Sequence, residues 1–232
     1  MNLKDRIVLI TGSSQGIGRE TALEFAKQGS KVVITYNVNK KQAHEVFKEC
    51  NKLNEAFLVH LDVTDTNSVK NCIEDTIDKF GAIDILINNA GFAVWKKFIE
   101  QSEEEIDNQI DINIRGLIKT TKQVLPYLKS QGEGMVINIG SGAGKEGIGG
   151  LSVYSSTKFA VRGLTQALSD EIMESGEKSN IRFYIVNPGM TSTKMTDFSG
   201  ISPKKVSDVI INTAKENFDK SSGEDIDVWD FV

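Results

Sequence analysis

The chain has 232 residues, which is long enough to bury a substantial core and fits one domain better than two. Its composition, 39% hydrophobic and 25% charged with 20 glycines and 3 prolines, is typical of a soluble globular protein. A formal net charge of -5 leaves no broad cationic surface, so neither nucleic acid nor an anionic membrane is an expected partner.

Membrane spans, leader segments and metal sites are not expected either. No apolar run approaches the roughly 20 residues that cross a bilayer. The first strand pattern starts at Arg6, which leaves no room for a signal peptide. The two cysteines and two histidines have neither a disulfide framework nor the spacing of metal ligands. We therefore expect a cytoplasmic protein without a metal.

Short apolar runs alternate with longer helical patterns along the chain. The predicted strands are residues 6–10, 31–35, 56–61, 84–88, 135–139, 181–186 and a final edge strand, 224–231. The predicted helices run from the glycine-rich turn to Gly29 and then over residues 39–53, 67–80, 103–129, 153–175 and onward from Pro203. Ser102 and Glu105 have capping-box spacing at the start of the longest helix. This order predicts an α/β fold with one domain over residues 1–232: a doubly wound, mostly parallel, seven-stranded sheet with helices on both faces.

A glycine-rich turn, residues 11–18, directly follows the first strand and opens a helix. Gly12 permits a sharp turn, Gly16 removes a side chain where a pyrophosphate would approach, and Gly18 lets the helix pack close to the strand. The helix N-terminus adds free N–H groups and a favourable dipole for an anion. Three glycines could form a plain tight turn, but their place between strand and helix favours dinucleotide binding.

The ends of the second and third strands bear on which dinucleotide binds. The end of the second strand has no carboxylate to repel a 2′-phosphate and no arginine to clamp one. Ser14, Asn37 and Lys40 could hold that phosphate together, which favours NADP over NAD, although Lys40 could equally belong to a solvated helix start. Asp62 could accept from an adenine amino group or cap a helix that begins near Thr64.

Polar signals follow three further strands. Tyr154 and Lys158 share a helix face because they are four residues apart, and a lysine ammonium lowers the pKa of a nearby tyrosine toward the working range. Ser141 follows the fifth strand, residues 88–91 end the fourth, and residues 187–189 end the sixth. Carboxyl ends of parallel strands meet at one sheet edge, so we expect these groups to converge on one ligand.

In combination, these motifs resemble the classical short-chain dehydrogenase/reductase family, which has a Rossmann-type fold. The turn at residues 11–18 is similar to the family's cofactor turn, residues 88–91 to its NNAG motif, and Tyr154 to Lys158 to its YxxxK motif. Ser141 precedes Tyr154 by 13 residues, as the family pattern asks. Asn113 matches the family's helix asparagine, and Pro188-Gly189 with Thr193 matches its nicotinamide-side loop. The resemblance runs from Arg6 to Thr193.

The resemblance implies a role for each matching residue. Tyr154 would be the general acid in reduction and the base in oxidation, while Lys158 would lower its pKa and bind the nicotinamide ribose. Ser141 would position the substrate oxygen, and Asn113 would hold a water that links Lys158 to solvent. Asn89 would line the adenosine side, and Thr193 with the backbone near Met190 would fix the carboxamide. The full set of implied cofactor contacts is Gly12, Ser14, Gln15, Gly16, Ile17, Gly18, Asn37, Asp62, Val63, Asn89, Ala90, Gly91, Tyr154, Lys158, Pro188, Gly189, Thr191 and Thr193.

Several positions depart from the family pattern. Gln15 stands where many NADP-using relatives have a basic residue, and Gly140 replaces the frequent first serine of a Ser-Ser pair. The stretch between Thr193 and Pro203 is short, which predicts a small substrate lid. The chain ends without the usual Gly-Gly tail, as in the branch of small ketone and hydroxy-acid reductases.

The resemblance implies an NAD(P)-dependent oxidoreductase that transfers a hydride between nicotinamide and a small carbonyl or secondary-alcohol substrate, of the ketone or 3-oxoacyl reductase type. A sugar-alcohol or hydroxy-acid dehydrogenase is the alternative enzyme. A non-catalytic dinucleotide sensor is disfavoured because all four catalytic-type residues are present. The family also implies a homodimer or homotetramer built on the helices at 103–129 and 153–175.

Overall fold

The computed structural model describes residues 1–174 and 179–232, and its seven strands form one sheet in which every pairing is parallel. The strands are β1 (Ile7–Ile10), β2 (Lys31–Tyr36), β3 (Ala56–His60), β4 (Ile85–Asn88), β5 (Glu133–Ile139), β6 (Asn180–Asn187) and β7 (Asp225–Asp227). Their order across the sheet is β3-β2-β1-β4-β5-β6-β7. The predicted doubly wound fold is confirmed, with a fully parallel rather than a mostly parallel sheet.

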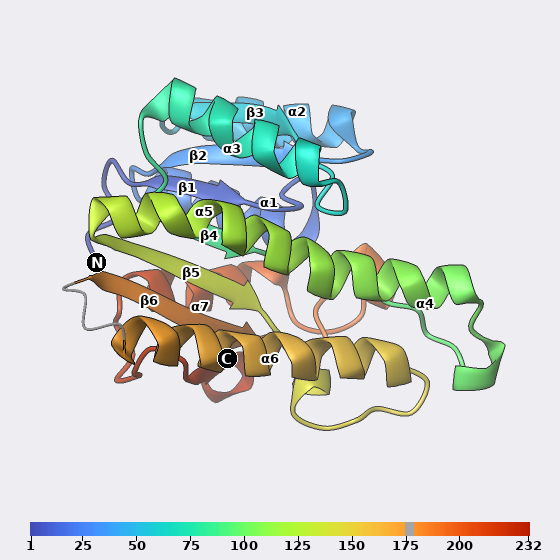
Figure 1. Cartoon of the computed structure of the whole chain (residues 1–232). Helices are drawn as coiled ribbons and strands as arrows, with labels where there is room; N and C mark the ends of the chain where they lie inside the picture. Colours follow the sequence, from blue (N-terminus) through green and yellow to red (C-terminus); the bar gives the residue numbers. More distant parts are fainter. Residues whose placement is uncertain (175–178) are drawn as a thin grey trace.

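Helices cover both faces of this sheet (Figure 1). One face carries α1 (Gly16–Lys27), α2 (Lys40–Asn51) and α7 (Pro203–Ala214). The other carries α3 (Thr66–Phe80), α5 (Leu117–Gln131) and α6 (Ser152–Glu174), and α4 (Glu103–Ile110) continues the direction of α5 beyond the sheet. Two apolar layers therefore sandwich the strands, which explains why the central strands are continuous hydrophobic runs.

The predicted helix at 103–129 is interrupted. Ser102 and Glu105 form the expected capping box, but residues Asp111–Gly116 form a π-helical turn between α4 and α5. The turn is centred on Asn113, whose side chain bonds outside its own helix. A local widening of this kind is typical of functional sites. The expected end of α6 at Ser175 lies outside the described residues.

The predicted final strand at 224–231 is wrong in length, because β7 covers only Asp225–Asp227. The chain then enters a 3-10 turn, Val228–Asp230, which buries Val228 against the core. Trp229 lies across Gly142 and Gly189, two glycines at the carboxyl edge of the sheet. The predicted strand therefore ends at Asp227, and the residues after it pack on the core and over the carboxyl edge of the sheet.

The strand order reverses between β1 and β4, so the connections that follow these two strands leave in opposite directions. Such a switch point opens a crevice at the carboxyl ends of the strands, where ligands of doubly wound folds bind. Within residues 1–174 and 179–232, none of the helices combines the length and apolar character of a membrane span. Both cysteines are buried and unbridged, and the described part of the chain holds no metal-type cluster of three acidic, His or Cys side chains.

Candidate active site

The glycine-rich turn after β1 is tied to the segment that follows β4. The Thr11 hydroxyl accepts hydrogen bonds from the backbone N–H groups of Asn89 and Ala90 at 3.0 and 2.9 Å. The Asn89 amide in turn donates to the carbonyl oxygens of Thr11 and Gly12 at 2.9 and 3.0 Å. Asn89 thus holds the turn as well as lining the cavity. The sequence reasoning missed Thr11, although a hydroxyl at the end of a buried strand was a signal.

The glycines are required by close packing. Gly12 has a φ of +66°, and an added Cβ would lie 3.1 Å from Cα of Ala90. At Gly18 an added Cβ would lie 2.5 Å from the Asn89 amide nitrogen and 2.6 Å from the Gly12 carbonyl oxygen. Gly18 therefore lets α1 pack against the turn itself and does not line the cavity.

The N-terminus of α1 is prepared for an anion. Its first turn contains no acidic residue, and Gln15 at the N-cap makes no side-chain capping bond. Uncapped N–H groups at a helix start, with no carboxylate beside them, favour a phosphate. Gly16 stands opposite Thr193, with only 3.2 Å between an added Cβ and Cγ2 of Thr193. The cradle fits the diphosphate of a dinucleotide lying between the turn and the loop after β6.

A cavity of about 1060 Å³ runs along this crevice. Most of the site residues expected from the sequence line it: Gly12, Ser14, Gln15, Gly16, Ile17, Asn37, Asp62, Val63, Asn89, Ala90, Gly91, Ser141, Tyr154, Lys158, Pro188, Gly189, Met190, Thr191 and Thr193. Gly18, Lys40 and Asn113 do not. Lys158 and Lys194 are the only cationic side chains in the lining, as far as the described residues go.

Asp62 lies at the end of the cavity that Asn37 also lines. Its Oδ1 accepts from the backbone N–H and the hydroxyl of Thr64 at 2.9 and 2.7 Å. Asp65, not Asp62, caps α3, so the helix-cap alternative is wrong. Burial acts to raise the pKa of Asp62, but hydrogen bonds from Thr64 and Asn37 hold it below its ordinary value. The carboxylate is therefore ionised at neutral pH.

Tyr154 and Lys158 project from α6 toward the end of β5. The Lys158 ammonium donates to the carbonyl oxygen of Ile139 at 2.8 Å and lies 5.6 Å from the centre of the Tyr154 ring. Ser141 faces the Tyr154 hydroxyl closely enough to act on the pKa of Tyr154, which it lowers. The structure thus brings together the three side chains that the sequence reasoning singled out.

Burial shifts the pKa values of two side chains in this cluster. Burial raises the pKa of Tyr154, and Ser141 only partly opposes this. Burial also lowers the pKa of Lys158 to about 8. The expected lowering of the Tyr154 pKa by Lys158 stays a prediction, and the Lys158 ammonium is bonded to the carbonyl oxygen of Ile139. Because burial raises its pKa, Tyr154 is protonated at neutral pH.

Asn113 lies behind this cluster and is buried. Its carbonyl oxygen accepts from the backbone N–H of Phe92 at 2.8 Å. Its amide donates to the carbonyl oxygen of Phe92 at 2.8 Å and to the hydroxyl of Thr157 at 3.0 Å. The side chain thus ties the π-helical turn to α6 and to the segment after β4. The water that Asn113 was expected to hold stays a prediction.

Gly140, the departure from the family pattern, is explained by Asn187. The Asn187 carbonyl oxygen accepts from the backbone N–H of Ser141 at 3.1 Å, and its amide donates to Asp227 at 2.9 Å. An added Cβ at position 140 would lie 2.1 Å from that carbonyl oxygen. A serine cannot occupy the position while Asn187 holds Ser141. Asp227 is also paired with Lys145, so β7 supports the placement of Ser141.

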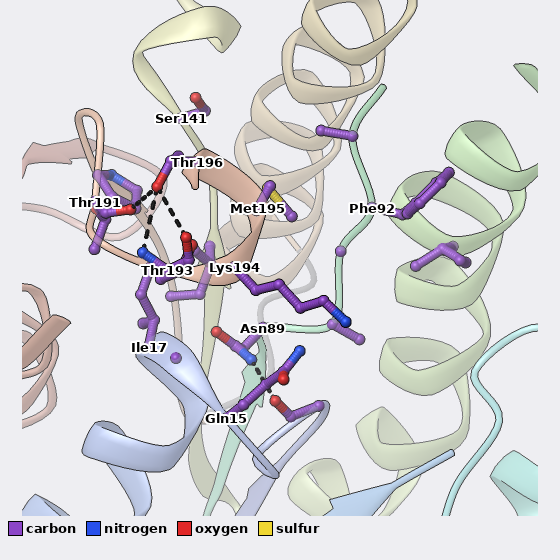
Figure 2. A pocket seen from close by; sticks show the side chains of 18 of the residues that line it. Gln15, Ile17, Asn89, Phe92, Ser141, Thr191, Thr193, Lys194, Met195 and Thr196 are labelled. Atoms are coloured by element: carbon purple, nitrogen blue, oxygen red, sulfur yellow. Dashed lines mark hydrogen bonds between the residues drawn. The ribbon is translucent and has the colours of Figure 1, made fainter. Parts of the chain in front are cut away.

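The loop after β6 closes over the cavity. A bridge between Thr191 and Ile201 joins its two ends. Inside the loop the Thr196 hydroxyl bonds with the backbone of Thr191 and Thr193 (Figure 2). The predicted small lid is therefore a short loop that is held together by its own hydrogen bonds. The fold keeps two of its non-glycine residues, Asp197 and Phe198, at positive φ.

Apolar side chains form the wall of the cavity beyond Ser141 and Tyr154, and of these the sequence reasoning named only Met190, for its backbone. They come from three loops and comprise Phe92, Trp95, Ile148, Leu151, Met190, Met195 and Phe198. Trp95 and Phe198 are 51% and 70% exposed, unusual for large apolar groups. No periodicity marks such residues, because they lie in the loops between strands and helices and only the fold brings them together.

The short chain dehydrogenase family model matches residues 6–202. The chain belongs to the short-chain dehydrogenase family. An uncharacterised oxidoreductase of Staphylococcus saprophyticus is 39% identical over 197 residues, covering 84% of this chain and 78% of that protein. A 3-oxoacyl-[acyl-carrier-protein] reductase of Thermotoga maritima is 34% identical over 198 residues, covering 85% and 78%.

Solved structures of the family are similar over nearly the whole chain. A 3-ketoacyl-(acyl-carrier-protein) reductase from Brucella melitensis, complexed with NADH, has a TM-score of 0.89 at 27% identity and covers 97% of both chains. Levodione reductase has a TM-score of 0.86 at 26% identity and covers 97% of this short-chain dehydrogenase and 96% of its own chain. The family resemblance inferred from the motifs is confirmed.

Proposed function

We propose that this short-chain dehydrogenase is a nicotinamide-dependent reductase of apolar ketones, with Tyr154 as the proton donor. The observation that carries the proposal is the convergence of Ser141, Tyr154 and Lys158 on one cavity that the uncapped start of α1 also lines. Membership of the dehydrogenase family and the reductases among its relatives support it.

The chain's own residues would supply proton chemistry. The bound cofactor supplies the hydride. The Ser141 hydroxyl would hold the substrate oxygen beside the Tyr154 hydroxyl, which donates its proton to that oxygen as negative charge develops. Burial keeps Tyr154 protonated at neutral pH, and this is the form that reduction needs. Lys158 would hold the nicotinamide ribose and favour loss of the tyrosine proton.

The apolar wall supports a ketone without charge next to its carbonyl group. A sugar alcohol needs several hydrogen-bonding partners and a hydroxy acid needs a cation. Trp95, Ile148 and Leu151 provide neither, and the side chain of Lys194 is directed toward Gln15 and Asn89 and away from Ser141 (Figure 2). A 3-oxoacyl compound or another apolar ketone fits this apolar wall better. This argument disfavours the alternative of a sugar-alcohol or hydroxy-acid dehydrogenase.

For the cofactor we propose NADH, which reverses the preference for NADP drawn from the sequence. Ser14 and Asn37 line the cavity, but Lys40, the cation of the expected 2′-phosphate site, does not. The carboxylate of Asp62 is ionised and bonded to Asn37, so it would repel a 2′-phosphate placed there. Titrating the purified protein with NADH and NADPH tests this, and tighter binding of NADPH would contradict it.

The test of the function is Tyr154→Phe, with Tyr127→Phe as the matched control outside the cavity. Oxidation of NADH at 340 nm is followed over a panel of ketones of graded polarity. We expect Tyr154→Phe to lose at least a hundredfold in kcat while its affinity for NADH changes less than threefold. Unchanged reduction in Tyr154→Phe would refute the proposed role. Binding of NADH without turnover of any ketone by the wild type would favour the sensor alternative.

We also propose that the protein is a homodimer or homotetramer and acts in the cytoplasm, as the resemblance implies. The helices that would form the interfaces between subunits are α4 with α5, and α6. Light scattering coupled to size-exclusion chromatography distinguishes the states by mass. A monomer at micromolar concentration would contradict the assembly.

A further inference from the structure

Lys194 is a cation of the cavity to which no motif assigns a role. It begins the 3-10 turn Lys194–Thr196, directly after Thr193, and its side chain is exposed within the cavity lining. Figure 2 shows the side chain extended across the pocket, with its ammonium directed toward the side where Gln15 and Asn89 lie. It therefore reaches from the loop after β6 toward the glycine-rich turn.

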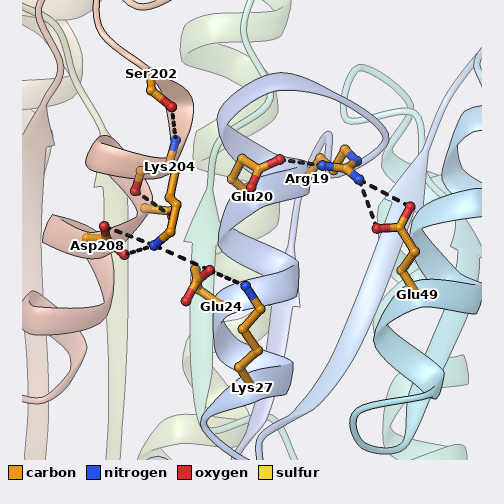
Figure 3. Close-up of polar contacts among 9 residues, drawn as sticks. Arg19, Glu20, Glu24, Lys27, Glu49, Ser202, Lys204 and Asp208 are labelled. Atoms are coloured by element: carbon orange, nitrogen blue, oxygen red, sulfur yellow. Dashed lines mark hydrogen bonds and ion pairs between the residues drawn. The ribbon is translucent and has the colours of Figure 1, made fainter.

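Arg19 on α1 and Lys204 on α7 are both paired with carboxylates (Figure 3). Arg19 is paired with Glu20 and, at 2.8 Å, with Glu49. Lys204 lies 2.9 Å from Asp208 and 3.6 Å from Glu24. Each of these two cations is paired with two carboxylates, so neither faces the cavity as a free charge.

Lys27 is also taken, at 2.6 Å from Glu24. In the cavity itself, Lys158 is buried and bonded to the backbone of Ile139. By contrast, no carboxylate in residues 1–174 or 179–232 forms an ion pair with Lys194. It is the exposed cation that the lining offers to a ligand.

The anion site at the start of α1, which faces Lys194, needs more positive charge than the helix provides. The start of α1 offers N–H groups and a dipole equivalent to about half a charge, whereas a diphosphate carries two negative charges. Gly16 packs against Thr193, so the residue after Thr193 starts within side-chain reach of that anion site. A lysine there supplies the charge that the helix lacks.

We propose that Lys194 binds the diphosphate of the nicotinamide dinucleotide from the side opposite α1, so that the anion lies between helix and loop. This rests on the cofactor given under the proposed function. The lysine adds a charge-assisted hydrogen bond and fastens the lid at residues 191–201 when the cofactor is present. Specificity for the 2′ position and for the substrate lies elsewhere in the cavity.

The experiment measures dissociation constants by the fluorescence of NADH and by calorimetry with ADP-ribose, which has the diphosphate, and AMP, which has one phosphate. Lys194→Gln is compared with Lys205→Gln, a control exposed on α7 outside the cavity. We expect about tenfold weaker binding of NADH and ADP-ribose by Lys194→Gln and less than threefold change for AMP, with Lys205→Gln unchanged. Lys194→Arg should retain most of the affinity. Raising the salt concentration should weaken binding more steeply in the wild type than in Lys194→Gln.

Several outcomes would overturn the inference while leaving the proposed function intact. Equal affinity for NADH in Lys194→Gln and the wild type is one. A loss confined to NADPH would assign the lysine to a 2′-phosphate, and a raised KM for ketone with unchanged NADH affinity would assign it to the substrate. If the wild type binds neither NADH nor NADPH, the proposed function fails first and this inference with it.

Discussion

At the scale of single residues, Lys158 places an ammonium in a buried position, which lowers the stability of the fold. The side chain is 5% exposed and its ammonium has one protein acceptor, the carbonyl oxygen of Ile139. Burial accordingly lowers its pKa to about 8. A residue kept in so unfavourable an environment is typical of a functional site.

Replacing Lys158 with Met should stabilise the fold while abolishing turnover. Below pH 8 the variant avoids burying an ammonium, and we expect a gain on the order of 2 kcal/mol in the free energy of unfolding. Between pH 8 and the ordinary lysine pKa of 10.5, the unfolded wild type binds the proton that its native state has lost. The stability of the wild type then rises with pH relative to that of Lys158→Met. The difference between their free energies of unfolding should therefore shrink. Urea denaturation at pH 7 and pH 10 measures it. A gap that widens with pH would show that burial does not depress this pKa.

At the scale of elements, the short strand β7 supports the active site from the far edge of the sheet. Asp227 accepts from the Asn187 amide at 2.9 Å and pairs with Lys145, while Asn187 holds the backbone N–H of Ser141. Two hydrogen bonds thus connect β7 to Ser141, one from Asn187 to Asp227 and one from Ser141 to Asn187. Loss of the first should loosen the serine without touching the cofactor cradle.

We expect Asp227→Ala to raise KM for the ketone and lower kcat/KM by about tenfold, ~1.4 kcal/mol, because Ser141 is less well positioned. Affinity for NADH should stay within twofold. Asp230→Ala, an exposed carboxylate three residues on, serves as the matched control. Equal losses in both variants, or a loss of NADH affinity alone, would contradict a positioning role for Asp227.

The elements that the sequence predicted well are those with a local cause. The capping box at Ser102 and the turn at Gly12 depend on neighbouring residues and could be identified from them. The π-helical turn at Asn113 could not, because it depends on bonds to Phe92 and Thr157, 21 and 44 residues away. The shortened β7 could not be predicted either, because Val228 and Trp229, which follow it, lie against residues that are distant in the sequence.

At the scale of the whole molecule, the carboxyl edge of the sheet holds the candidate active site, and the amino edge holds polar contacts that stabilise the fold. The alternation of strands and helices was enough to predict that polar motifs meet at the carboxyl edge. It could not predict the apolar wall or the reach of Lys194, since both depend on how irregular loops pack in space. The amino edge has its own polar cluster, in which Arg6 lies 2.8 Å from Asp84 and 2.6 Å from Glu133.

Arg6→Met should destabilise the whole molecule and spare its chemistry. Arg6 links the starts of β1, β4 and β5, and Asp84 also accepts from the backbone N–H of Ile7 at 2.7 Å. Removing the guanidinium leaves the half-buried Asp84 carboxylate with fewer partners, and we expect a loss of about 1–2 kcal/mol in the free energy of unfolding. The control is Lys70→Met, which breaks an exposed i,i+4 pair with Glu74 and should cost no more than ~0.5 kcal/mol. Urea denaturation gives both values, and kcat/KM should equal that of the wild type at 25 °C. A drop in kcat/KM in the folded variant would show that the amino edge is coupled to the active site after all.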